Sequence, residues 1–151
     1  MSLRERITDD MKTAMKSRDA VRLGAIRFLL SEVKYAEIAA GKPLTDDDIT
    51  QVVTREIKRR RDSIEKYKEG GRSDLVDKET ADLNVLSEYV PEQLSEEEII
   101  GIAREVISEL HAVTKADKGK VMSALMQRVR GKADGKMVGK VVDDLLSGDS
   151  A

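Results

Sequence analysis

Apolar residues recur at every third or fourth position along almost all of this 151-residue chain, and two-residue alternation is nearly absent. A spacing near 3.6 residues puts side chains on one face of an α-helix, whereas a half-buried strand needs alternation. Aromatic residues, which favour strands, make up only 3% of the chain. The sequence therefore predicts an all-α protein.

Glycine and proline divide the first 90 residues into four helical segments. Gly41-Lys42-Pro43 and Gly70-Gly71 each end a segment, because glycine favours the backbone conformation that terminates a helix and proline cannot continue one. Asp19 is a preferred N-cap, and Thr45 precedes three acids that the positive end of a helix favours. The expected helices run from Leu3 to Met15, from Asp19 to Ile38, from Thr45 to Tyr67 and from Ser73 to Val90.

Pro91 marks the predicted domain boundary, because proline lacks an amide hydrogen and clashes with the preceding helical turn. Ser95 and Glu98 then have the spacing of a capping box, which begins a new helix. The sequence therefore predicts an N-terminal four-helix domain at residues 1–90, followed by a C-terminal three-helix bundle at residues 91–151.

Two shorter helices are expected after the one that begins at the capping box. Asp117 is the expected N-cap of the first, and Gly131 is expected to end it. Asp134 is the expected N-cap of the second, whose apolar stripe runs from Met137 to Leu146. His111 falls near the end of the preceding helix, where the helix dipole favours it, and a general base is the alternative role.

Composition and spacing exclude several kinds of catalytic and metal site. The chain has no Cys and a single His, so thiolate zinc sites, multi-His metal sites and Cys nucleophiles are impossible. Gly119-Lys120 and Gly135-Lys136 lack the upstream glycine and the Ser or Thr of a phosphate-binding loop. We therefore expect no catalytic residue, no metal ion and no cofactor. The chain also has no run of about 18 apolar residues and no signal-peptide pattern, which predicts a cytoplasmic protein without a membrane partner.

A net charge of −2 hides a strong separation of charge along the chain. Residues 73–110 contain 11 acids and two bases, whereas residues 115–140 contain eight bases and two acids. Such a basic helical hairpin can bind a sugar–phosphate chain, because neutralising phosphates releases condensed counterions. A solvated charged face is the alternative interpretation. Because no aromatic residue lies in this region, an RNA contact is expected through backbone and shape, without base stacking.

A second basic tract, at residues 55–72, holds eight bases and four acids. Its Lys58-Arg59-Arg60-Arg61 run circles the helix and does not line one face. Glu56, Asp62 and Glu65 lie close to these bases along the helix, so local ion pairs are expected.

Four stretches have the order and spacing of motifs found in one known family, at Asp10–Lys16, Arg27–Ser31, Glu56–Tyr67 and Tyr89–Glu98. They resemble proteins of the YqeY family, and the resemblance covers essentially the whole chain. Two stretches near the C-terminus, KGKVM and GKADGKMV, resemble the tail domain of the B subunit of the aspartyl/glutamyl-tRNA amidotransferase. The stretches that carry this second resemblance are Lys118–Met122 and Gly131–Val138.

The resemblance implies a four-helix N-terminal domain, a three-helix C-terminal domain and tRNA as a partner. In the amidotransferase the tail domain helps to hold the tRNA, while catalysis takes place in a separate, larger domain that has no counterpart here. The family name carries a carbon–nitrogen ligase activity with glutamine as amido-N-donor, for which this chain shows no catalytic residues. By motif, the resemblance implies RNA-facing roles for Lys118, Lys120, Lys132 and Lys136.

Helical spacing adds Arg128, Arg130 and Lys140 to these nucleic-acid-binding candidates. By the same motif, Gly131 and Gly135 are expected to shape the turn between the last two helices. Asp134 is expected to have a structural, helix-capping role there.

Three functional hypotheses follow. The first is a non-catalytic module that binds tRNA or associates with a tRNA enzyme, through the basic C-terminal hairpin. The second is an accessory of glutamine-dependent amide transfer, in which a tRNA-dependent amidotransferase or an aminoacyl-tRNA enzyme is the partner and supplies the catalysis. The third is a protein-interaction adaptor that uses the acidic fourth and fifth helices.

Overall fold

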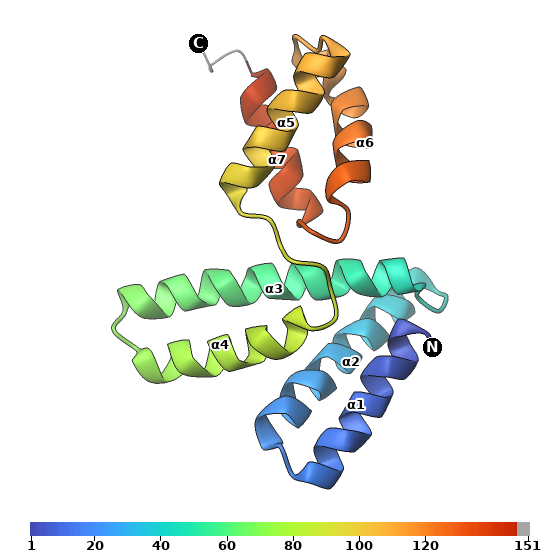
Figure 1. The fold of residues 1–151 in the computed structure, drawn as a ribbon, viewed down its shortest axis with the longest axis vertical. Coiled ribbons are helices and arrows are strands. Elements are labelled where there is room, and N and C mark those ends of the chain that lie inside the picture. The colour runs from blue at the N-terminus through green and yellow to red at the C-terminus, as the bar shows by residue number, and fades with distance from the viewer. Residues whose placement is uncertain (148–151) are drawn as a thin grey trace. The chain divides into compact units, whose positions relative to one another are not determined.

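The computed structural model describes residues 1–147, and their regular secondary structure is helical (Figure 1). Seven α-helices and one short 3-10 helix follow one another along these residues, and the prediction of an all-α protein is confirmed. No helix within residues 1–147 combines the length and the apolar character needed to cross a membrane. The helices are α1 (Leu3–Ser17), α2 (Ala20–Ala40), α3 (Asp46–Glu69), α4 (Ser73–Ser87), α5 (Glu96–Leu110), η1 (Lys115–Asp117), α6 (Lys118–Val129) and α7 (Gly135–Leu146).

The chain divides into two compact units, Met1–Pro91 and Glu92–Ala151. The first contains α1 to α4 and the second contains α5 to α7. Each unit has its own cluster of buried apolar side chains. The division lies one residue after the predicted boundary, in the non-helical stretch around Pro91.

Helix ends in the N-terminal unit follow the signals in the sequence. The Asp19 side chain accepts a hydrogen bond from the Arg22 amide at 3.1 Å, as an N-cap does. Thr45 and Asp48 form a reciprocal capping box at the start of α3. Gly41 ends α2 with φ at +71°, a left-handed conformation that glycine adopts without a Cβ clash. Local capping therefore fixes both ends of α2 and the start of α3.

The core of this unit forms where two helical hairpins meet, α1 with α2 and α3 with α4 (Figure 1). Helix α3 packs against the other three, and its Ile57 is 1% exposed. Ile7, Ile26, Leu29 and Leu86 meet it from α1, α2 and α4, and are fully buried. Burying one such side chain stabilises the fold by about 1.5–3 kcal/mol.

Tyr89, just after α4, connects the two hairpins. Its hydroxyl donates a hydrogen bond to a carboxylate oxygen of Asp10 on α1 at 2.6 Å. The Arg6 guanidinium lies 4.9 Å from the centre of the Tyr89 ring, and Arg22 donates to Glu88 at 2.7 Å. Burial, together with the hydrogen bond to Asp10, raises the pKa of Tyr89 well above its ordinary value. These contacts attach the end of α4 to α1 and α2.

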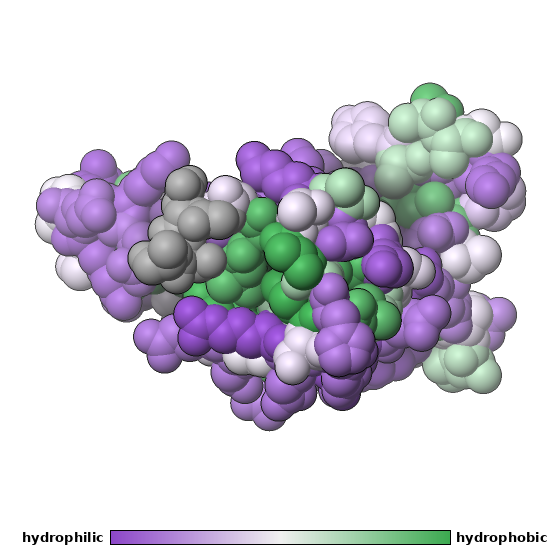
Figure 2. All heavy atoms as spheres, turned by 90° about the horizontal axis from the view of Figure 1, so that it is seen from above, coloured by the Kyte–Doolittle hydropathy of each residue, from purple (hydrophilic) through white to green (hydrophobic). Residues whose placement is uncertain are grey.

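In the C-terminal unit, α5, α6 and α7 pack around Ala103, Leu125 and Val142, none of which is exposed. Ser95 and Glu98 form the predicted capping box at the start of α5. Figure 2 shows an apolar area, in green, close to the end of α7 and bordered by purple polar side chains. The three helices thus share one core.

Asp117 and Asp134 occupy the predicted N-cap positions of α6 and α7, but neither side chain makes the capping hydrogen bond. Asp117 does not cap α6 with its side chain. It instead accepts hydrogen bonds from the Val113 and Thr114 amides, at 2.9 and 3.2 Å, and these donors lower its pKa. Asp134 occupies the N-cap position of α7, where its backbone oxygen accepts from the Val138 amide, but its side chain makes no capping hydrogen bond. Asp side chains can bind backbone amides outside the helix as readily as within it, which explains the error at Asp117.

Candidate nucleic-acid interface

The turn between α6 and α7 is held in place by the segment that precedes α5. The Leu94 amide donates to the Lys132 backbone oxygen at 2.8 Å, and the Gln93 side chain donates to the Gly131 oxygen at 2.8 Å. Gly131 has φ at +79°, a conformation that glycine adopts without the strain that a Cβ brings. The turn is therefore a defined element that presents neighbouring side chains in a fixed geometry.

Gly135 does not have the predicted turn-shaping role. It is the first residue of α7, its φ is not positive, and a Cβ built on it meets no atom within 4 Å. The turn geometry explains the glycine at Gly131. No contact among the described residues requires a glycine at Gly135.

Three of the seven predicted RNA-facing bases form ion pairs inside the C-terminal unit. Lys118 lies 2.9 Å from Asp143 on α7, and Lys120 lies 3.8 Å from Asp117. Arg128 lies 3.4 Å from Glu105 and 3.5 Å from Glu109, both on α5. These pairs are partly exposed, so each contributes little to stability, about 0–1 kcal/mol. They nevertheless offset the positive charge that the sequence places on the hairpin. The residues involved are Lys118, Lys120 and Arg128 on the basic side, with Asp117, Asp143, Glu105 and Glu109 on the acidic side.

The other four predicted bases are all exposed. Arg130 lies at the C-cap of α6. Lys132 lies in the turn, and Lys136 and Lys140 lie one helical turn apart on α7. Within residues 1–147, Lys132, Lys136 and Lys140 form no ion pair. We call these three residues the α7 lysine patch. The seven predicted bases thus leave a smaller candidate surface, the α7 lysine patch around the start of α7.

The N-terminus of α7 adds to the positive potential of the patch. The first amides of a helix have no partner within the helix, and the aligned peptide dipoles favour an anion there. Lys136 follows the first residue of α7, so its ammonium group and these amides lie on the same end of the helix. An anion such as a phosphate group is favoured by this combination.

Several bases of the second basic tract form ion pairs within the N-terminal unit. Lys58 pairs with Asp62 at 2.9 Å and Arg59 with Glu56 at 2.8 Å, which confirms the predicted local ion pairs. Arg60 pairs instead with Glu79 on α4, at 2.9 Å. This longer-range pair depends on how α3 and α4 pack, which the sequence spacing does not reveal.

His111 has the predicted structural position. It is the C-cap of α5, with a left-handed backbone at φ +52°, and its amide donates to the Ser108 oxygen. The described residues contain no group of three His, Asp or Glu side chains that could hold a metal ion.

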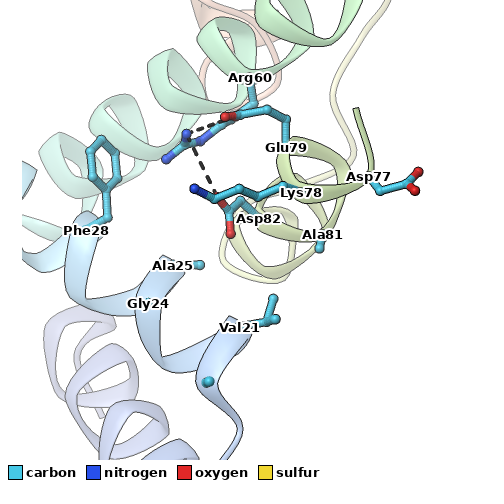
Figure 3. Close-up of a pocket in the computed structure, with 11 residues that line it drawn as sticks. Val21, Gly24, Ala25, Phe28, Arg60, Asp77, Lys78, Glu79, Ala81 and Asp82 are labelled. Atoms are coloured by element: carbon cyan, nitrogen blue, oxygen red, sulfur yellow. Dashed lines mark hydrogen bonds and ion pairs between the residues drawn. The ribbon is translucent and has the colours of Figure 1, made fainter. Parts of the chain in front are cut away.

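The sequence does not predict a cavity of about 690 Å³ in the N-terminal unit (Figure 3). Helices α2, α3 and α4 line it, and Arg60 lies at one end with its guanidinium 4.6 Å from the centre of the Phe28 ring. Burial raises the pKa of Asp82 in this cavity, although the nearby Arg60 opposes the shift. The sequence offers one signal for this cavity. Val21 and Phe28 are apolar and lie seven residues apart, and neither belongs to the face of α2 that is buried in the core.

Comparison with known proteins relates most of this sequence to one family. A family model described as Yqey-like protein matches residues 4–146. A protein of Pyrenophora tritici-repentis, named altered inheritance of mitochondria protein 41, mitochondrial, is 31% identical over 144 residues, which cover 93% of this chain and 79% of that protein. The protein of the same name from Saccharomyces cerevisiae is 33% identical, over 84% of this chain and 68% of its own length. An uncharacterized protein of Schizosaccharomyces pombe is 33% identical over 54% of this chain and 67% of its own length.

These relatives correct one prediction. The expected cytoplasmic location is wrong by this comparison, because the proteins from Pyrenophora tritici-repentis, Lachancea thermotolerans and Saccharomyces cerevisiae are named as mitochondrial. The expectation rested on the absence of a signal peptide and of a membrane-spanning segment, and neither absence identifies a compartment.

Proposed function

Because this chain belongs to the family of Yqey-like proteins, we propose that it is a non-catalytic module that binds tRNA through its C-terminal unit. The contact surface is the α7 lysine patch, together with the amides at the start of α7. The partner is recognised through its phosphate backbone.

The observation that carries this proposal is that the side chains of Lys132, Lys136 and Lys140 are available to a ligand. All three are exposed and form no ion pair within residues 1–147, whereas Lys118, Lys120 and Arg128 are paired with carboxylates. A lysine without a carboxylate partner can neutralise a phosphate without first breaking an ion pair. The patch is therefore the part of the predicted hairpin that is available to RNA.

The composition of this unit supports backbone recognition. No aromatic residue occurs after Tyr89, so bases cannot stack on an aromatic side chain there. Lysine is a flexible point charge that binds phosphates without reading the base edges. Affinity is therefore expected to depend strongly on salt and only weakly on the sequence of the tRNA.

We also propose that the two units are separate domains, one of four helices and one of three. Each has its own buried core, and the division falls in the non-helical segment around Pro91. Residues 92–151 expressed alone are expected to give a helical circular dichroism spectrum and a cooperative thermal transition. A spectrum of an unfolded chain contradicts this division.

The tRNA proposal is tested by reversing the charge of two patch residues, with a matched control on another helix. Lys136→Glu/Lys140→Glu changes two exposed lysines one turn apart on α7. Lys12→Glu/Lys16→Glu changes two exposed lysines of the same spacing on α1 and alters the net charge equally. Fluorescence anisotropy with labelled tRNA at low salt gives the affinity of the full chain and of both variants.

We expect the α7 variant to bind about tenfold or more weakly than the unchanged chain, which corresponds to about 1.4 kcal/mol or more. The α1 variant is expected to retain most of the affinity. Undetectable binding of the unchanged chain, or an equal loss in both variants, contradicts the proposal. Circular dichroism melting of each variant shows that a loss of affinity does not reflect unfolding.

A further inference from the structure

Helix α2 carries large apolar side chains on its exposed face. Val21, Phe28, Tyr35 and Ile38 are 55, 38, 66 and 69% exposed, although α2 is also a core helix of its unit. The first three follow at intervals of seven residues and Ile38 follows three residues later, so all four share one face of the helix. We call this row the α2 strip. It is distinct from the face of α2 that buries Ile26, which lies in the core.

The cavity described above lies at one end of the strip. Val21 and Phe28 line it from α2, and in Figure 3 they border the same open space. The rest of its wall combines four small residues, among them Gly24, Ala25 and Ala81, with five charged ones. A Cβ built on Gly24 meets no atom within 4 Å, so the space above this position is open. The cavity can therefore accept an apolar side chain from outside.

Positive charges flank the strip. Arg27 and Lys34 precede Phe28 and Tyr35 by one residue each, so they form a row along one edge. On the other side, Lys78 of α4 extends across the cavity in Figure 3. None of these three bases forms an ion pair within residues 1–147.

Most of the acids near the strip gather at the cavity. Glu79 and Asp82 contact Arg60 there, at 2.9 and 4.0 Å. Asp77 is also part of the cavity wall, although its carboxylate points outward in Figure 3. Glu32 is the acid next to the strip on α2. The edge of the strip that Arg27 and Lys34 form is thus basic, and a ligand with acidic residues along that edge is complementary to it.

We propose that the α2 strip and its cavity bind an amphipathic helix of a partner protein whose apolar face is bordered by acidic residues. An apolar side chain of that helix enters the cavity between Val21 and Phe28. The rest of its apolar face covers Tyr35 and Ile38, while its acids meet Arg27, Lys34 and Lys78. This mode of recognition places an amphipathic helix in an apolar groove with anchors about one and two turns apart.

Two other occupants fit less well. A second copy carries Arg27 and Lys34 along the same edge, so two copies that meet through these edges repel each other. An anionic lipid surface matches the charge, but it is flat, whereas the cavity is a concave site of about 690 Å³. Both occupants are distinguishable outcomes of the test.

The test uses the full chain and two synthetic helical peptides of about 20 residues, long enough to cover the span from Val21 to Ile38. Both peptides carry leucines on one face, and the edges of that face are glutamates in one peptide and lysines in the other. Fluorescence anisotropy measures their affinities for the unchanged chain and for Tyr35→Ser/Ile38→Ser. The control is Met15→Ser, which removes an apolar side chain that is 49% exposed on α1, outside the strip.

We expect the glutamate peptide to bind about tenfold more tightly than the lysine peptide, and Tyr35→Ser/Ile38→Ser to weaken it by about tenfold. Met15→Ser is expected to have no effect. Arg27→Glu/Lys34→Glu is expected to reverse the preference between the two peptides. Lys136→Glu/Lys140→Glu is expected to leave peptide binding unchanged, which separates this proposal from tRNA binding.

Several results overturn the proposal. They are the absence of binding by either peptide, equal binding of both, and an equal loss in Met15→Ser. Sedimentation that shows a dimer of the chain, lost in Tyr35→Ser/Ile38→Ser, assigns the strip to a second copy instead. Binding to phosphatidylserine vesicles that is lost in the same variant, without peptide binding, assigns it to a lipid surface.

Discussion

Tyr89→Phe removes one hydroxyl from a residue that is 5% exposed and leaves its ring in place. The lost hydroxyl donates to the Asp10 carboxylate at 2.6 Å and attaches the segment after α4 to α1. A hydrogen bond to a charged group contributes about 1.5–3 kcal/mol. Asp10 is 31% exposed and lies 4.0 Å from Arg22, so water and Arg22 compensate part of the loss. We expect a decrease of about 1 kcal/mol in the free energy of unfolding at neutral pH.

The same substitution should change how stability depends on pH. Burial and then Asp10 raise the pKa of Tyr89 in the folded chain above the value of about 10 that holds in the unfolded chain. Below pH ~10 the hydroxyl is protonated in both states, so its full contribution is present. Above that pH the unfolded chain loses the proton first, and the contribution of the phenol decreases. With solvent screening, titration of Tyr89 is expected to lower the free energy of unfolding of the unchanged chain by about 1 kcal/mol by pH ~11. Tyr89→Phe has no phenol at this position, so its free energy of unfolding does not decrease for this reason.

Urea unfolding followed by far-ultraviolet circular dichroism, at neutral pH and near pH ~11, measures both effects. Lysine titration also lowers stability at high pH, but it affects both proteins, so the informative quantity is the difference between them. The difference of about 1 kcal/mol at neutral pH should become much smaller in alkali. A difference that stays the same at both pH values refutes the reasoning, because it shows that the phenol has no raised pKa in the folded chain.

Four further predictions concern the C-terminal unit. Gly131→Ala should lower the free energy of unfolding by about 1 kcal/mol because its φ is positive, whereas Gly135→Ala should be neutral or stabilising, as measured by thermal melting. Ser95→Ala should cost about 1 kcal/mol through loss of the α5 cap, measured by urea unfolding, and a cost near zero contradicts the capping role. Arg128→Ala should change stability by less than about 1 kcal/mol because its ion pairs are exposed. Leu125→Ala, at a fully buried site, should cost about 2–5 kcal/mol in the same assay.

The features that the sequence predicts well are those that local signals determine. The breaks at Gly41 and Pro91 and the caps at Asp19, Thr45 and Ser95 depend on residues close to one another along the chain. Backbone donors at a helix start must find an acceptor nearby, so a Ser, Thr or Asp at the right position fixes the boundary. The signal is ambiguous where one side chain has two sets of amides within reach, as at Asp117.

The features that the sequence predicts poorly depend on how helices pack. The pairing of Arg128 with Glu105 and Glu109 requires α5 and α6 to lie side by side, and spacing within α6 gives no sign of it. The cavity beside Phe28 likewise exists only because α2, α3 and α4 meet there. Counting bases along the sequence therefore overestimates the charge available to RNA.

The central claim is that the α7 lysine patch neutralises phosphates of tRNA. It is tested most directly by the slope of the logarithm of the tRNA affinity against the logarithm of the salt concentration, for the unchanged chain, Lys136→Glu/Lys140→Glu and Lys12→Glu/Lys16→Glu. Each lysine that contacts a phosphate adds about one to the magnitude of this slope. The account predicts a decrease of about two for the α7 variant and no change for the α1 variant. Equal slopes for all three proteins contradict it.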